Sequence, residues 1–138
     1  MKSVIEVCAL ALVLGCAAGA QNPSVPVLRP GVHVEMAAAS HAVAVPAADA
    51  LDARVIAVTA NGKLYLGIKS VEIGALKDLS PGPVYVKADA RVPYQTILTV
   101  LDALRGRPVV LLTAPPLSNP DKGQIIPPYG IDVISGGR

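Results

Sequence analysis

The sequence predicts a small α+β domain, in which a mixed β-sheet has two helices packed on one face. Two observations lead to this fold. Residues 54–60 are β-branched and apolar, residues 63–66 alternate, and Asn61-Gly62 lies between them, a pattern typical of a β-hairpin. Residues 84–113 read as strand, helix and strand, an order that implies a right-handed parallel crossover. The sheet is therefore expected to combine antiparallel with parallel pairing.

The composition limits both size and function. The chain has 138 residues, of which 52% are hydrophobic and 16% charged, so it is long enough for one core and too apolar for a disordered chain. The net charge is +2, and Phe and Trp are absent. A nucleic-acid partner is not expected, because the chain lacks both a strongly basic surface and aromatic stacking platforms.

The predicted domain spans residues 54–113 and opens with the hairpin. Its strands are Arg54–Ala60 and Lys63–Leu66, and Asn61-Gly62 supplies two residues that tolerate a positive φ angle for a two-residue turn. Tyr65 is expected on the outer face. Alternation places four apolar side chains on the opposite, core-facing side: Ile56, Val58, Leu64 and Leu66.

Two helices and two more strands complete the predicted domain. A loop at 67–70 leads to an amphipathic helix over 71–79, and a strand follows at 84–88. Pro93 pre-sets φ in the first turn of the second helix, which leads to a buried strand at 109–113. The apolar stripe of this second helix is predicted to be Tyr94, Ile97, Leu98, Leu101 and Leu104.

Residues 1–20 form an N-terminal hydrophobic segment with three readings. It resembles a cleaved export signal, with Ala18-Gly19-Ala20 as the cleavage site. Cys16 follows a small residue and is the candidate for lipidation if the segment is a lipoprotein signal. A retained membrane helix would place Glu6 near one end of the span, where an ionisable side chain suits a proton relay. Otherwise Glu6 is an ordinary polar residue of a signal sequence.

The other segments flank the predicted domain. Residues 21–53 are a tether rich in Pro and Ala, within which 31–36 alternates like a short strand. Residues 114–138 are a Pro/Gly-rich tail, with an extra strand at 130–134. No disulfide is expected in a mature exported domain, because no Cys follows position 16. His33 and His41 lack neighbouring ligands, so no metal site and no cofactor are expected.

Three blocks of this chain resemble the periplasmic domain of the ExbD/TolR biopolymer transport proteins. They are PGVHVEMAAAS (Pro30–Ser40), VIAVTANGKLYL (Val55–Leu66) and PVYVKADARVPYQTILTVLDALR (Pro83–Arg105). The most specific part is Asp89 followed by Val92-Pro93-Tyr94. Val4-Ile5-Glu6-Val7 is similar to the Leu-Ile-Asp-Val of the family's membrane helix, although the residue here is Glu and only five residues precede it.

The resemblance implies an accessory component of an energy-transducing complex driven by the proton-motive force, of the ExbB/ExbD or TolQ/TolR type. Glu6 would then be the proton relay, and Asp89, Arg91, Pro93 and Tyr94 the binding or structural motif. The implied partners are a second copy in a homodimer, an ExbB/TolQ-like membrane protein, and a TonB/TolA-like protein or peptidoglycan. The chain would cross the bacterial inner membrane once, with its C-terminal domain in the periplasm.

Two other function classes remain. A cleaved or lipidated binding module, secreted into or anchored in the periplasm, would keep the domain without proton coupling. An enzyme is not expected, because no nucleophile, base and orienting group fall into a recognisable arrangement and no Gly-rich phosphate loop follows a strand. Asp89 and Arg91 have a structural reading as well: Asp between a strand and a helix commonly accepts free backbone N–H groups.

Overall fold

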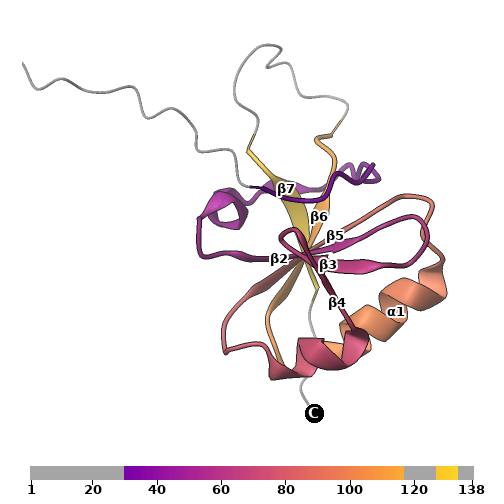
Figure 1. Cartoon of the computed structure of the whole chain (residues 1–138). Coiled ribbons are helices and arrows are strands. Elements are labelled where there is room, and N and C mark those ends of the chain that lie inside the picture. Colours follow the sequence, from indigo (N-terminus) through magenta and orange to yellow (C-terminus); the bar gives the residue numbers. More distant parts are fainter. Residues whose placement is uncertain (1–29, 117–126, 134–138) are drawn as a thin grey trace, which may run out of the picture.

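The computed structural model describes residues 30–116 and 127–133, and these form one seven-stranded mixed sheet with helices on both faces (Figure 1). The strand order is β1-β7-β6-β5-β2-β3-β4. The helices are η1 (Pro46–Asp49) and η2 (Ile73–Asp78), both 3₁₀, and α1 (Tyr94–Ala103). The strands are β1 (Val43–Ala44), β2 (Arg54–Val58), β3 (Leu64–Leu66), β4 (Lys69–Val71), β5 (Val84–Ala88), β6 (Val109–Thr113) and β7 (Tyr129–Val133).

The centre of the sheet is parallel and its two sides are antiparallel. Strand β5 pairs in parallel with β2 and with β6, while β3 and β7 add antiparallel neighbours outside them. The connections β2 to β5 and β5 to β6 carry η2 and α1, which contact each other on one side of the sheet in Figure 1. The predicted α+β class, the mixed sheet and the two helices on one face are therefore confirmed.

The main core lies between the sheet and these two helices. Strand alternation delivers Ile56, Val58, Val84 and Val86 to this face, and all four are fully buried. Burial of each such side chain stabilises the fold by about 1.5–3 kcal/mol. The complete set of buried residues in this core is Ile56, Val58, Leu64, Leu76, Val84, Val86, Val100, Leu104 and Val109.

A smaller apolar cluster covers the opposite face. Tyr85 and Leu112 point there from β5 and β6, and Ala48 of η1 packs on them. Tyr85 is only 6% exposed as a result. The face opposite α1 is therefore a second packed layer.

The hairpin between β2 and β3 has a different turn from the one predicted. Val58 pairs with Leu64, the Thr59 N–H donates to the Lys63 carbonyl (3.0 Å), and the Gly62 N–H donates to the Thr59 carbonyl (2.8 Å). Gly62 has a φ of +79°, whereas no non-glycine residue in the described ranges has a positive φ. A two-residue type I′ turn needs two positive φ angles, so the chain uses a three-residue loop that ends in glycine.

Strand β4 was not predicted; residues 67–70 were assigned to a loop. Gly67 and Ile68 join β3 to β4 in a second hairpin, in which Leu66 pairs with Lys69. Gly67 has a φ of +65°, and a positive φ at the first of two turn residues matches a type II′ turn. The signal for this strand was the Gly-X pair, which is a weaker pattern than Asn-Gly. The predicted helix over 71–79 accordingly shortens to η2.

The buried face of α1 differs from the predicted stripe. Val100 and Leu104 are fully buried, and Ile97 and Leu101 pack against the core. Tyr94 is 75% and Leu98 41% exposed, so neither belongs to the core-facing side. The predicted stripe was therefore right at Ile97, Leu101 and Leu104 and wrong at Tyr94 and Leu98.

The segments assigned to tether and tail both contribute to the sheet. Residues 31–36 form no strand; instead the chain from 31 to 38 crosses the carboxyl ends of β5 and β6, with isolated bridges from Met36 to Asp89 and from Ala38 to Ala114. Val34 is 7% exposed in this position. Strand β7, at the position of the predicted extra strand, pairs with β6 along its length and also with β1. The folded unit therefore extends beyond residues 54–113.

Candidate functional site

Asp89 follows β5 and is the most highly bonded side chain of the predicted motif. It is 5% exposed. Oδ1 accepts the Arg91 backbone N–H (3.0 Å) and Nε (2.9 Å), while Oδ2 accepts Arg91 Nη2 (3.0 Å) and the Glu35 backbone N–H (3.3 Å). The two side chains form a bidentate ion pair, with backbone donors on the same carboxylate.

The electrostatics of this pair keep both groups charged. Hydrogen bonds from the Arg91 side chain and backbone, and from the Glu35 N–H, hold the pKa of Asp89 well below its usual range, although burial works in the opposite direction. Asp89 in turn raises the pKa of Arg91. A carboxylate that already accepts four hydrogen bonds is poorly suited to general acid–base work or to binding a metal. The structural reading of Asp89 is the one its contacts support.

The backbone around Asp89 joins three distant parts of the chain. Its N–H donates to the Val58 carbonyl (2.9 Å), which continues the pairing of β2 with β5, and its carbonyl accepts the Val92 N–H (3.0 Å). The Ala90 N–H donates to the Glu35 carbonyl (2.7 Å). This corner therefore fixes the end of β5, the entry to α1 and the segment around Glu35 in one place.

Pro93 and Tyr94, the other two motif residues, start α1. Pro93 has φ −59° and ψ 138° and occupies the position just before the helix, so it is not itself a helical residue. Its carbonyl accepts the Thr96 N–H (3.0 Å). The Tyr94 side chain is exposed. The structure thus brings Asp89 and Arg91 together and leaves Tyr94 on the surface.

The remaining predicted site residues do not enter this corner. Glu6 and Cys16 lie outside the described residues. Within the described ranges, no helix is both long and apolar enough to cross a membrane, and no three His, Cys, Asp or Glu side chains are grouped as metal ligands. His33 and His41 are both exposed.

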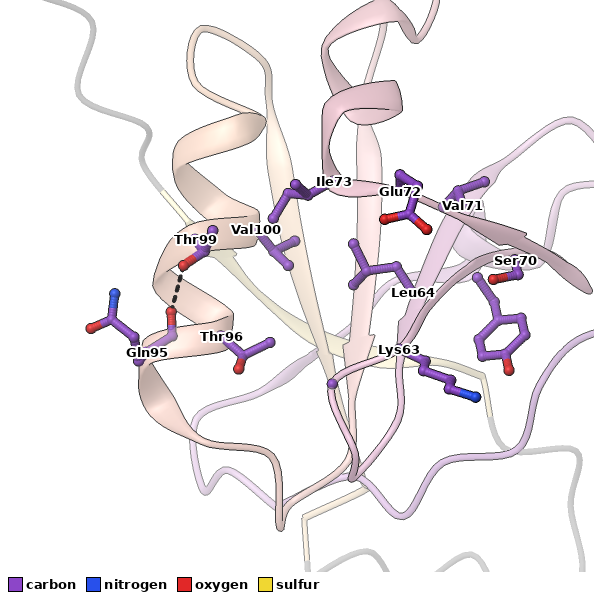
Figure 2. A pocket seen from close by; sticks show the side chains of 12 residues that line it. Lys63, Leu64, Ser70, Val71, Glu72, Ile73, Gln95, Thr96, Thr99 and Val100 are labelled. Carbon is purple, nitrogen blue, oxygen red and sulfur yellow. Dashed lines mark hydrogen bonds between the residues drawn. The ribbon is translucent and has the colours of Figure 1, made fainter.

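A groove of about 650 Å³ runs between α1 and the β3–β4 hairpin (Figure 2). Leu64, Ile73 and Val100 point toward one another between these elements, as Figure 2 shows. The Thr99 hydroxyl donates to the Gln95 carbonyl (2.9 Å) and is therefore already engaged within the helix. The polar lining residues are Lys63, Tyr65, Ser70, Glu72, Gln95, Thr96 and Thr99.

The chemistry of this groove favours binding over reaction. Its lining residues include neither His nor Cys, and its charged members are Lys63 and Glu72. Strand β4 ends the sheet on this side, and its residues Ser70 and Val71 line the groove. A strand edge beside an apolar depression can receive an extended peptide through main-chain hydrogen bonds. The sequence could not reveal this groove, because β4 itself was not predicted.

This chain matches no protein-family model, no curated protein and no solved structure.

Proposed function

We propose that this chain is an accessory component of an energy-transducing complex driven by the proton-motive force, similar to the ExbB/ExbD or TolQ/TolR systems. In this proposal the described domain is a binding module that engages a TonB/TolA-like protein or peptidoglycan in the periplasm, and residues 1–20 cross the inner membrane beside an ExbB/TolQ-like protein. The domain itself has no catalytic role.

The observation that carries the proposal is the meeting of three sequence blocks at Asp89. Glu35 belongs to the first block that resembles the ExbD/TolR proteins, Val58 to the second, and Asp89 with Arg91 to the third. Glu35, Val58 and Arg91 are each hydrogen-bonded to Asp89, so the three blocks meet at a single corner. Residues that resemble a family in three separate places, and that also form one bonded corner, support a shared domain more strongly than any one block does.

The mechanism proposed for the membrane segment depends on Glu6. A carboxyl group in a low-dielectric site can hold a proton and release it when water or a cation approaches, whereas a glutamine of the same shape cannot titrate. A unit charge that crosses about 100 mV gains about 2.3 kcal/mol, so several protons could drive a conformational step. The periplasmic module would transmit that step to its partner.

The experiment that tests the proposal replaces Glu6 by Gln in the cell that encodes the chain. Transport that depends on the proton-motive force should be abolished while the amount of protein stays unchanged. Glu35→Gln is the matched control, because the hydrogen bonds of Glu35 at the corner come from its backbone groups and its exposed carboxylate acts there only through its charge on Arg91, so transport should stay intact. Normal transport in the Glu6→Gln cells would show that transport does not depend on proton transfer by Glu6.

The second candidate is a cleaved or lipidated periplasmic module without proton coupling. The sequence favours it through Cys16 and Ala18-Gly19-Ala20. Intact mass and N-terminal sequencing of the membrane-extracted protein distinguish the two candidates. A mature chain that keeps Glu6 supports the transducing complex, and one that starts at an acylated Cys16 or after Ala20 supports the second candidate.

The homodimer is also part of the proposal, and it rests on the resemblance, because the described domain offers neither Tyr85 on an exposed sheet face nor a free strand at 31–36 for pairing with a second copy. Tyr85 is buried beneath η1, and the 31–36 segment is bonded to its own chain at Asp89 and Ala90. Sedimentation of a polypeptide of residues 21–138 at micromolar concentrations tests self-association. A monomer across that concentration range would exclude the dimer for this part of the chain.

A further inference from the structure

A second cavity, of about 420 Å³, lies on the opposite side of the sheet from α1. Met36, Ala48, Val55 and Leu112 form part of its wall and belong to the smaller apolar cluster. Its volume falls within the range of pockets that hold small organic molecules. The other lining residues are Pro30, Gly31, Asp49, Gly67, Lys87, Thr113, Pro115, Pro127, Pro128 and Tyr129.

Lys87 is the cation among the described residues of this lining. It alternates with Val86 and Ala88 along β5, so its side chain leaves the sheet on the face away from the main core. The residue is half-buried, and a Cβ placed on Gly31 would lie 3.5 Å from Nζ, so the ammonium rests against the backbone at Gly31. Burial lowers the pKa of Lys87, with no neighbouring charge acting against it.

No described residue neutralises this ammonium. The ion pairs found among residues 30–116 and 127–133 are Asp89 with Arg91 and Asp102 with Arg105. Asp49 also lines the cavity, but it is exposed and does not lie within ion-pair distance of Lys87. An ammonium partly removed from water without a counter-ion is unfavourable, and an anion supplied by a ligand would relieve that cost.

The lining also selects the kind of anion. Among the described lining residues, one ammonium and one carboxylate, Asp49, give no net charge, so a dianion would meet repulsion from Asp49 without a second described cation. The apolar wall favours a ligand with an apolar body rather than a bare inorganic ion. We infer that this cavity binds a small organic monocarboxylate, whose carboxylate bonds to Lys87 and whose apolar body contacts Met36, Val55 and Leu112. This inference does not depend on the proposed function.

The test is a titration of the full chain with sodium octanoate, followed by calorimetry or by NMR. Wild-type protein should bind octanoate at millimolar or lower concentrations. Lys87→Met keeps the length and apolar stem of the side chain but removes the charge, so affinity should fall about tenfold or more, the usual weight of a charge-assisted hydrogen bond. Lys69→Met, which removes an exposed lysine on β4, should leave binding unchanged.

Two further measurements serve as controls. One tests whether octanoate binds through its carboxylate or only through its alkyl chain, and the other tests whether the Lys87→Met protein is still folded. Octanol, with the same alkyl chain and no charge, should bind wild-type protein more weakly than octanoate and should not distinguish the Lys87→Met variant. The Lys87→Met protein should unfold at the same temperature or a higher one, because it no longer buries an unpaired ammonium. Lys87→Gln provides the same readout if the Met variant does not fold. Equal octanoate affinity in wild-type and variant proteins, or no binding to either, would overturn the inference.

Discussion

Some of the hydrogen bonds of Asp89 follow from the residues next to it in the sequence, and others do not. An Asp between a strand and a helix predicts a carboxylate that accepts backbone N–H groups, and the Arg91 N–H does donate to it. The bond from the Glu35 N–H could not be predicted, because 54 residues separate the two positions and nothing local brings them together. The local bond from the Arg91 N–H to Asp89 could therefore be predicted from the sequence, whereas the long-range bond from the Glu35 N–H could not.

The Asp89 corner predicts a specific loss of stability in acid. Because the folded-state pKa of Asp89 lies below its unfolded value, its contribution is complete above the unfolded pKa and disappears as the pH falls through the folded one. Asp89→Asn should lower the unfolding temperature by several degrees at neutral pH. The gap from wild-type protein should then narrow as the pH falls from about 4 toward 2.

Asp102→Asn is the control for that measurement. Asp102 also pairs with an arginine, Arg105, but both side chains are largely exposed, and surface pairs contribute little. Thermal unfolding followed by circular dichroism across this pH range compares the three proteins. A difference between wild-type and Asp89→Asn proteins that stays constant with pH would show that Asp89 acts through shape and not through its charge.

For the helix α1, it was easier to predict that the segment is helical than to predict which face of the helix is buried. The spacing of apolar residues over 94–104 identified α1 correctly, because several apolar residues recur at helical intervals. The same segment also offers Val100 and Ala103, so two adjacent stripes are nearly equally apolar. The contact with η2 and the sheet decides between them, and that contact is tertiary. The sequence alone therefore did not determine which of the two stripes faces the core.

The orientation of α1 can be tested with two leucines. Leu104 is fully buried and Leu98 is 41% exposed, although both were predicted to face the core. Leu104→Ala should lower the free energy of unfolding by about 2–5 kcal/mol, because it leaves a cavity in a packed core. Leu98→Ala should lower it by about 0.5 kcal/mol, as for a surface substitution. Urea denaturation measures both, and equal losses would mean that α1 presents another face.

Strand β4 is the element that the proposed partner should contact. In a two-residue hairpin the pair next to the turn, Leu66 with Lys69, is hydrogen-bonded, so Ser70 directs its N–H and C=O outward. A peptide from a TonB-like protein should therefore shift the amide signals of Lys69–Val71 and of the adjacent Leu64–Leu66 in a labelled domain. Ser70→Pro removes the outward N–H without removing a bond to β3, so it should weaken peptide binding and spare the fold.

The same peptide titration could also show that the peptide does not bind at the edge of β4. Shifts centred on Asp89, Arg91 and Tyr94 would place the peptide at the start of α1, where Tyr94 is exposed. Unchanged binding by the Ser70→Pro protein would lead to the same conclusion. Either result would assign recognition to the corner and leave the β4 edge without a role.

For the molecule as a whole, the boundaries were harder to predict than the core. Residues 54–113 contain the hairpin, both core helices and the parallel strands, and their apolar periodicity made them recognisable. Strand β7 includes Gly130 and Asp132, so it lacks the β-branched run that marks β6. Gly130 is needed because a Cβ there would lie 2.8 Å from Val110 Cγ1 and 3.0 Å from the Leu111 carbonyl oxygen. Close backbone packing thus selected a residue that weakens the strand pattern, and the strand predicted at 130–134 was assigned to the tail and not to the domain.

The last prediction follows from this arrangement: a polypeptide of residues 21–116, which lacks β7, should be much less stable and less soluble than one of residues 21–138. Removal of β7 would uncover the whole edge of β6, whose Val109–Thr113 run is apolar, and would leave β1 without its partner. It would also remove Val133 from the main core. An exposed apolar edge promotes association between chains.

Thermal unfolding and light scattering of the two polypeptides measure both effects. Gly130→Ala in the longer polypeptide is the graded control, because its Cβ would force β7 away from β6 without deleting the strand. Its unfolding temperature should fall between those of the other two proteins. If the shorter polypeptide stays monodisperse and unfolds at the temperature of the longer one, then residues 54–113 and the segment before them suffice for the fold, and β7 is an accessory strand.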